Sequence, residues 1–164
     1  MNIASSTGGR PRLKVCCIAS IDEARLAIRL GANAVGLVSA MPSGPGVIAD
    51  ERIEEIAATI PPCVSTFLLT SSRDVDEIIH QQHRFGVDTL QLCDEVAPGA
   101  IRDLRSKMPG ISIVQVVHVA DAVRQVRPFG VDVCSGLRTD GALDAIKLKR
   151  FIRRLGSVNP PSGD

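Results

Sequence analysis

The sequence predicts an α/β protein with a parallel sheet, and three features of the chain indicate this. Short apolar segments alternate with amphipathic, helix-like segments along nearly its whole length. The apolar segments are continuous runs, which is typical of parallel strands covered on both faces. A glycine recurs at the joint between a helix and the next strand, at Gly31, Gly86 and Gly130. Such joints favour either a (β/α) barrel or an open, doubly wound sheet.

Six strands in regular alternation with helices are expected along the chain. The strands are predicted at Leu13–Ile18, Ala34–Val38, Cys63–Leu69, Asp88–Leu92, Ile111–Val117 and Val131–Cys134. The helices are predicted at Ile21–Leu30, Asp50–Ile60, Ser71–Phe85, Ala97–Lys107, Ala120–Val126 and Ala142–Leu155.

Local signals set several of these bounds. Leu13–Ile18 is the first β-prone run after a polar start, and Ser20 can cap the helix that follows it. Ser71 or Ser72 can open the third helix. The loop Met41–Val47, rich in glycine and proline, separates the second strand from its helix. This loop is either part of a substrate pocket or an irregular connection.

The length of the chain fits one domain with a sizeable core, because the sequence has 164 residues. We expect a flexible leader at residues 1–12, a (β/α) domain at 13–156 and a disordered tail at 157–164. A closed (β/α) barrel has eight strands and typically about 250 residues. Six strands therefore indicate an open sheet or a barrel that lacks two units.

Composition excludes several classes of protein. The net charge is +1, aromatic residues make up 2%, and there is no Trp or Tyr, so neither nucleic acid nor a membrane surface is an expected partner. No apolar run is long enough to cross a membrane, and the first residues do not form a signal peptide. We expect a cytoplasmic protein.

The cysteines favour the same compartment. They are odd in number and scattered, at Cys16, Cys17, Cys63, Cys93 and Cys134. This pattern predicts reduced, mostly buried thiols rather than a disulfide framework, and no CxxC spacing suggests a metal.

Cys16 is the first candidate for chemistry, because it stands near the carboxyl end of the first strand, where such sheets place their sites. Lys14 lies two residues earlier and points to the same side of the strand, where it could help to keep a thiolate. Cys17 should face the other way and serve packing. The alternative for Cys16 is a buried structural cysteine.

Other polar residues near strand ends are weaker candidates. Asp94 ends the fourth strand and is the best placed carboxylate for an acid, whereas Asp132 stands at a strand start, which is the wrong end. Asp121 follows the fifth strand, close to the start of the next predicted helix. His118 ends the fifth strand and could act as an acid, a base or an anion partner. Caps and loop solvation are the alternatives for the three aspartates. For His118 the alternative is a loop histidine with satisfied hydrogen bonds.

Ser135 and Gly136 follow the last predicted strand. Backbone N–H groups at such a turn can hold a phosphate, and Arg138 adds positive charge. The alternative is an ordinary connection between a strand and a helix.

Several segments together resemble one enzyme family. Lys14-Val15-Cys16-Cys17-Ile18 resembles the Lys-Ile-Cys-Gly motif that opens phosphoribosylanthranilate isomerase. The segment 31–37 resembles its second element, and Leu90-Gln91-Leu92 resembles its Val-Gln-Leu-His strand. The segment 129–136 resembles its last strand with the phosphate-binding Ser-Gly. The match to its final helix extends the resemblance from Leu13 to Leu155.

The resemblance implies a TIM barrel of tryptophan biosynthesis that needs no cofactor and no metal. The reaction is the Amadori rearrangement of N-(5-phosphoribosyl)anthranilate, a phosphorylated sugar, by an intramolecular oxidoreductase. Cys16 matches the family's base, and Ser135 and Gly136 match its phosphate-binding Ser-Gly. Lys14 and Arg138 are further candidates for substrate or phosphate binding because of their positive charge. The family's acid is an Asp that ends the sixth strand.

That sixth strand and the seventh are missing from the match, which indicates an internal deletion near Asp121. Cys17 also replaces the family's Gly, Gly44-Pro45-Gly46 replaces Ser-Pro-Arg, and Arg138 replaces Glu. We therefore expect an impaired isomerase. The alternatives are a non-catalytic remnant that binds a partner or self-associates through exposed sheet edges, and another phosphosugar-binding barrel.

Overall fold

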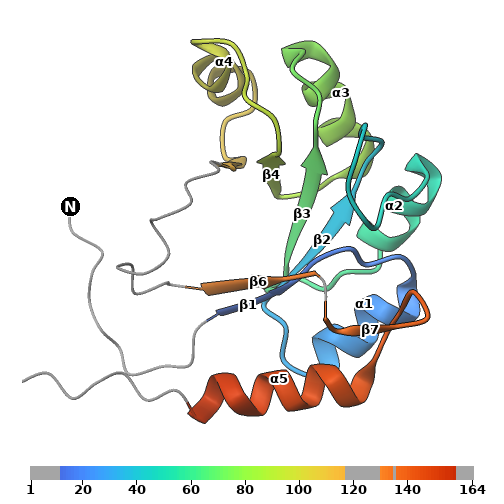
Figure 1. The fold of residues 1–164 in the computed structure, drawn as a ribbon. Coiled ribbons are helices and arrows are strands. Elements are labelled where there is room, and N and C mark those ends of the chain that lie inside the picture. Colours follow the sequence, from blue (N-terminus) through green and yellow to red (C-terminus); the bar gives the residue numbers. More distant parts are fainter. Residues whose placement is uncertain (1–11, 117–129, 135, 158–164) are drawn as a thin grey trace, which may run out of the picture.

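The computed structural model describes residues 12–116, 130–134 and 136–157, and its centre is one curled parallel sheet (Figure 1). The six strands stand in the order β5-β4-β3-β2-β1-β6. They are β1 (Arg12–Val15), β2 (Ala34–Val38), β3 (Ser65–Thr70), β4 (Thr89–Leu92), β5 (Ser112–Gln115) and β6 (Gly130–Val133). The helices are α1 (Ile21–Arg29), α2 (Asp50–Ala57), α3 (Val75–Phe85), α4 (Ala100–Lys107) and α5 (Ala145–Ser157).

The α/β class and the six parallel strands of an incomplete (β/α) barrel are confirmed. The first strand along the chain, β1, has the last one, β6, as its neighbour, with Lys14 opposite Asp132. This pairing of first and last strands is what barrel closure requires. Strands β5 and β6 stand at the two ends of the described sheet.

Several predicted bounds were wrong by a few residues. Strand β1 ends at Val15, and Cys17 has a φ of 59°, which the extended conformation of a strand does not allow. Helix α3 begins at Val75 because the carboxylate of Asp74, rather than Ser71 or Ser72, accepts the N–H of the first turn.

The C-terminal part differs more from the prediction. Arg138–Thr139 (β7) and Ala142–Leu143 (β8) form a small antiparallel hairpin where a helix start was predicted. Asp144 then accepts the N–H groups of Ile146 and Lys147, and so caps α5. The predicted helix at 120–126 lies outside the described residues, as do the leader up to residue 11 and the tail from 158.

The two faces of the sheet carry different side chains. Leu13 and Val15 of β1 belong to the large apolar cluster between the sheet and the helices, which also contains Ile53, Ile78 and Leu148. Lys14 and Cys16 point to the opposite, concave face, as the alternation along a strand requires.

A smaller cluster lies near the carboxyl ends of the strands. Its members are Cys16, Cys17, Val38 and Leu69, packed against Met41, Phe67, Cys93 and Cys134. No helix in the described residues is both long and apolar enough to span a membrane.

Candidate functional site

Cys16 lies at the carboxyl edge of the sheet, directly after β1, and is buried. Its N–H donates to the carbonyl of Val133 at 2.9 Å, which fixes its backbone against β6. Gly36 on β2 leaves room for the sulfur, since a Cβ there would lie 2.8 Å from Cys16 Sγ. The thiol therefore occupies a space that a larger residue on β2 would fill.

The side chain of Lys14, from β1, lies beside this thiol and contacts residues of two other strands. Its Nζ lies 2.6 Å from Asp132 Oδ2 on β6 and 2.8 Å from Gln91 Oε1 on β4. The same Nζ lies 3.8 Å from Cys16 Sγ and 4.9 Å from the centre of the Phe67 ring. The prediction that Lys14 and Cys16 share a face is thus confirmed.

The surroundings of the thiol favour its protonated form. Burial raises the pKa of Cys16, and the positive charge of Lys14 offsets only part of this increase. The carboxylate of Asp132 raises the pKa of the thiol further. Burial also raises the pKa of Cys93, with a smaller contribution from Cys16. Without the charge of Asp132, the pKa of Cys16 would be lower and a larger fraction of the thiol would be ionised.

The position of Asp132 differs from the one that the sequence predicts. It was placed at a strand start, but β6 begins at Gly130, so Asp132 lies inside the strand and opposite Lys14. Pairing the first strand with the last, as a barrel requires, would have put these two residues at one level of the sheet. Gln91 belongs to the Leu90-Gln91-Leu92 motif, and no local signal in the sequence predicts its contact with Lys14.

Two cysteines contradict the prediction of reduced thiols. Cys17 and Cys134 are joined by a disulfide whose Cα atoms are 5.8 Å apart. The reason is topological, since Cys17 follows β1 and Cys134 follows the adjacent β6. A third residue, Cys63, is exposed rather than buried and has a φ of 80°.

Arg138 forms a salt bridge with the carboxylate of Glu23. Its Nη1 and Nη2 donate to Glu23 Oε1 and Oε2 at 2.9 and 3.0 Å, and Nη2 also donates to the carbonyl of Cys17. Gly136 is exposed and has a φ of 79°. Ser135, the other member of the predicted phosphate turn, lies outside the described residues, as do His118 and Asp121.

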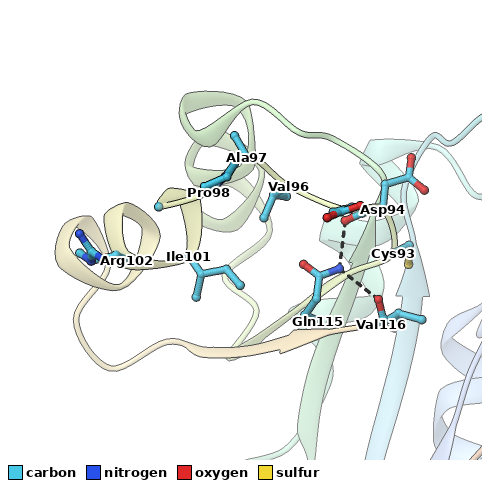
Figure 2. A pocket seen from close by; sticks show the side chains of 11 residues that line it. Cys93, Asp94, Val96, Ala97, Pro98, Ile101, Arg102, Gln115 and Val116 are labelled. Atoms are coloured by element: carbon cyan, nitrogen blue, oxygen red, sulfur yellow. Dashed lines mark hydrogen bonds between the residues drawn. The ribbon is translucent and has the colours of Figure 1, made fainter. Parts of the chain in front are cut away.

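Asp94 lines a separate cavity of about 750 Å³ at the ends of β4 and β5 (Figure 2). Its carboxylate is 3.7 Å from Arg73, whose side chain is largely exposed, whereas the side chain of Asp94 is about half-buried. Gln115 Nε2 closes one wall by donating to the carbonyls of Asp94 and Val116 at 3.0 and 3.2 Å. Cys93 also lines this cavity and connects it to the thiol cluster. Among the described residues, no group of three or more metal-ligating side chains is present.

The chain was compared with known families and proteins. No family model matches it. The N-(5'-phosphoribosyl)anthranilate isomerase 2 of Methanosarcina mazei is 31% identical over 121 residues, which cover 72% of this chain and 54% of that protein. The isomerase of Nitrosococcus oceani is 27% identical over 209 positions, which cover 92% of this chain and 100% of the relative.

The last alignment is longer than the 164-residue chain itself. The relative therefore contains residues inside the matched span that this chain lacks. By contrast, the chain spans about half the length of the Methanosarcina relative that it matches.

Solved structures show the same fold. A phosphoribosyl anthranilate isomerase in complex with reduced 1-(o-carboxyphenylamino)-1-deoxyribulose 5-phosphate matches with a TM-score of 0.78 and 21% identity. The enzyme from Thermus thermophilus also matches with a TM-score of 0.78, at 19% identity. Each match covers 90% of this chain and 100% of the other. With its fold and its similarity along the chain to curated relatives, the chain belongs to the phosphoribosylanthranilate isomerase family.

Proposed function

We propose that this protein acts on N-(5-phosphoribosyl)anthranilate in tryptophan biosynthesis as an impaired isomerase, with Cys16 as the base. The observation that carries the proposal is the placement of the Cys16 thiol at the carboxyl edge of the sheet, 3.8 Å from the ammonium of Lys14. A cation at this distance favours the thiolate form that proton abstraction needs.

The proposed step is the removal of the C2 proton from the open-chain iminium form of the substrate, in which the nitrogen is protonated and carries the positive charge. The pair of electrons from the C2–H bond forms a C1=C2 double bond, and the C1=N bond becomes a C–N single bond, which neutralises the nitrogen. Cys16 Sγ holds the proton. The enolamine then tautomerises to the aminoketose.

The ring-opening step before it needs an acid at the ring oxygen, and we propose that this chain lacks the strand that bears the family's acid. We propose that the deletion falls between Gln115 and Gly130. The extra aligned positions of the relative support this, and so do the places of β5 and β6 at the two ends of the sheet. Loss of an acid typically lowers turnover by about 10²–10⁴-fold. The raised pKa of Cys16 lowers the thiolate fraction further.

We propose that the phosphate group of the substrate binds at Ser135 and Gly136. We expect the backbone N–H groups to bind the phosphate more directly than Lys14 and Arg138 do. Each of these two side chains already contacts a carboxylate, Lys14 that of Asp132 and Arg138 that of Glu23. Their proposed contribution to binding is therefore a positive charge at some distance rather than a direct contact. Asp94 is the carboxylate that we propose as a partial substitute for the acid.

Steady-state turnover of N-(5-phosphoribosyl)anthranilate by the purified chain tests the proposal, with the Thermus thermophilus enzyme as reference. We expect turnover at least 10²-fold below the reference, and none above background in Cys16→Ala. Cys63→Ala is the matched control, because Cys63 is an exposed cysteine outside the site. If Cys16→Ala and Cys63→Ala turn over substrate equally, Cys16 is not the base.

A second candidate is self-association without catalysis. In the described residues, β5 pairs only with β4 and β6 only with β1, and Val114 of β5 is exposed. Such edges can pair with another chain. Analytical ultracentrifugation that gives a monomer across a hundredfold range of concentration would rule this candidate out.

A further inference from the structure

The carboxyl edge of the sheet holds an unusual concentration of sulfur. Four of the five cysteines, Cys16, Cys17, Cys93 and Cys134, lie in one packed cluster. They come from the ends of three strands, β1, β4 and β6. Two of the four form a disulfide that closes a sequence separation of 117 residues.

We propose that Cys17 and Cys134 are a reversible redox-modification site, which a small-molecule disulfide of the glutathione class oxidises and the corresponding thiol reduces. The proposal does not depend on isomerase activity. It requires only that the two cysteines exchange with such a reagent in the folded protein.

The two sulfurs differ in access, and this assigns their order of reaction. Cys134 is partly exposed, whereas Cys17 is 3% exposed and lies beneath Gly46, where an added Cβ would collide with the Cys17 side chain. Cys134 is therefore the sulfur that the reagent reaches. Cys17 is the sulfur that completes the bridge.

The exchange balances in two displacements. The thiolate of Cys134 attacks one sulfur of glutathione disulfide, which forms a mixed disulfide and releases one glutathione thiolate. The thiolate of Cys17 then attacks Cys134 Sγ, which forms the internal bond and releases the second glutathione. The protein pair loses two electrons, glutathione disulfide gains them, and the two thiol protons end on the released glutathione.

The other two thiols of the cluster are poor competitors. Burial raises the pKa of Cys16 and of Cys93, which lowers the thiolate fraction available for the first attack on the reagent. The topology also favours the observed pair, since Val15 and Val133 stand opposite each other and the two chains continue side by side from there. Cys63 is exposed but precedes β3, at the other edge of the sheet.

The bridge fastens the C-terminal part of the chain to the N-terminal strand. Without it, β6 would still pair with β1, and Arg138 would still bind Glu23. Reduction should therefore loosen this part without releasing it. Oxidation would fasten the residue that follows β6 to the residue that follows Cys16.

The test equilibrates the full-length protein in glutathione buffers of increasing oxidised fraction, followed by acid quenching and alkylation of free thiols. Peptide mass spectrometry then reports which cysteines are bridged. We expect a Cys17–Cys134 bridge that rises and falls with the buffer, and that persists in Cys16→Ala. A bridge that includes Cys16 or Cys93 instead, or glutathione adducts alone, would overturn the proposal.

Thermal unfolding supplies a second readout. We expect reductant to lower the Tm of the wild type by several degrees and to leave the Tm of Cys134→Ser unchanged. Cys17→Gly removes the other sulfur and suits the positive φ, so it should be equally insensitive. Cys63→Ser is the control that should respond like the wild type. Equal sensitivity of wild type and Cys134→Ser would contradict the proposed bridge.

Discussion

Glu23→Gln is the substitution whose effect the structure specifies most fully. The carboxylate accepts four hydrogen bonds, and its side chain is only 12% exposed. Two bonds come from Arg138, at 2.9 and 3.0 Å, and two come from the N–H groups of Leu143 and Ala19, at 2.8 and 2.9 Å. All four partners are donors, so Glu23 joins α1 to the β7–β8 hairpin entirely as an acceptor.

An amide at this position places an NH₂ group against donors and removes the charge that Arg138 faces. Hydrogen bonds to charged groups contribute about 1.5–3 kcal/mol each, and breaking a buried ion pair costs about 3–5 kcal/mol. We expect a loss of about 3–4 kcal/mol, a large share of the roughly 5–15 kcal/mol that stabilises a domain. With a urea m-value of about 1–3 kcal/mol/M, the midpoint should fall by at least about 1 M.

The assay is urea unfolding followed by circular dichroism, with Glu51→Gln as the matched control. Glu51 also contacts an arginine, Arg84, but is 75% exposed, so its substitution should leave the midpoint unchanged. A midpoint for Glu23→Gln that equals that of Glu51→Gln would refute the assigned role of Glu23.

The same carboxylate predicts a pH dependence. Burial alone would raise the pKa of Glu23, but the hydrogen bonds from Arg138, Ala19 and Leu143 and the charge of Arg138 together lower it. The folded pKa therefore lies below the unfolded value of about 4.3. The stabilisation is present above the unfolded pKa and is lost as pH falls through the folded pKa. The free energy of unfolding of the wild type should converge with that of Glu23→Gln in that acidic range and stay parallel at neutral pH.

Further predictions concern the thiol site and one helix cap. Gly36→Ala should destabilise the protein by about 1–3 kcal/mol in urea unfolding and slow turnover, because its Cβ would lie 2.8 Å from Cys16 Sγ. Unchanged stability and turnover would show that the thiol can move aside. Lys14→Met should slow the alkylation of Cys16 by iodoacetamide, whereas Asp132→Asn should speed it. The reason is that Lys14 lowers the pKa of the thiol and Asp132 raises it. Alkylation rates that change in the same direction in both variants would contradict this. Asp74→Ala should cost about 1 kcal/mol of unfolding free energy, since Asp74 caps α3 at 2.8 Å; Ser71→Ala, at the cap position expected from sequence, should cost less.

The sequence allowed the sheet and its helices to be predicted because apolar runs and glycine joints are local signals. It also placed Lys14 and Cys16 on one face, since alternation along a strand needs no knowledge of its neighbours. The cap at Asp74 was missed because serine and aspartate cap helices almost equally well, and both were available. The β7–β8 hairpin was missed because two-residue strands carry no periodicity.

The contacts between distant segments could not be read in the same way. Asp132 and Cys134 gain their partners only once β6 is known to lie beside β1, a pairing across more than a hundred residues. Arg138 was matched to a phosphate because its positive charge was visible, whereas the carboxylate that binds it belongs to α1. Residue type suggested these roles, but topology determined the partner.

The position of β1 between β2 and β6 has a consequence for how the chain folds. Strands β2 to β5 each pair with a neighbour in sequence, so this part can form through local contacts as the chain emerges during synthesis. The β1–β6 pairing joins Arg12 to Gly130 and must close a loop of more than a hundred residues. Until β6 arrives, one edge of β1 stays unpaired in the nascent protein. We expect docking of β6 to be the slow step of folding, with φ-values near zero in β6 and substantially higher ones in β2 and β3.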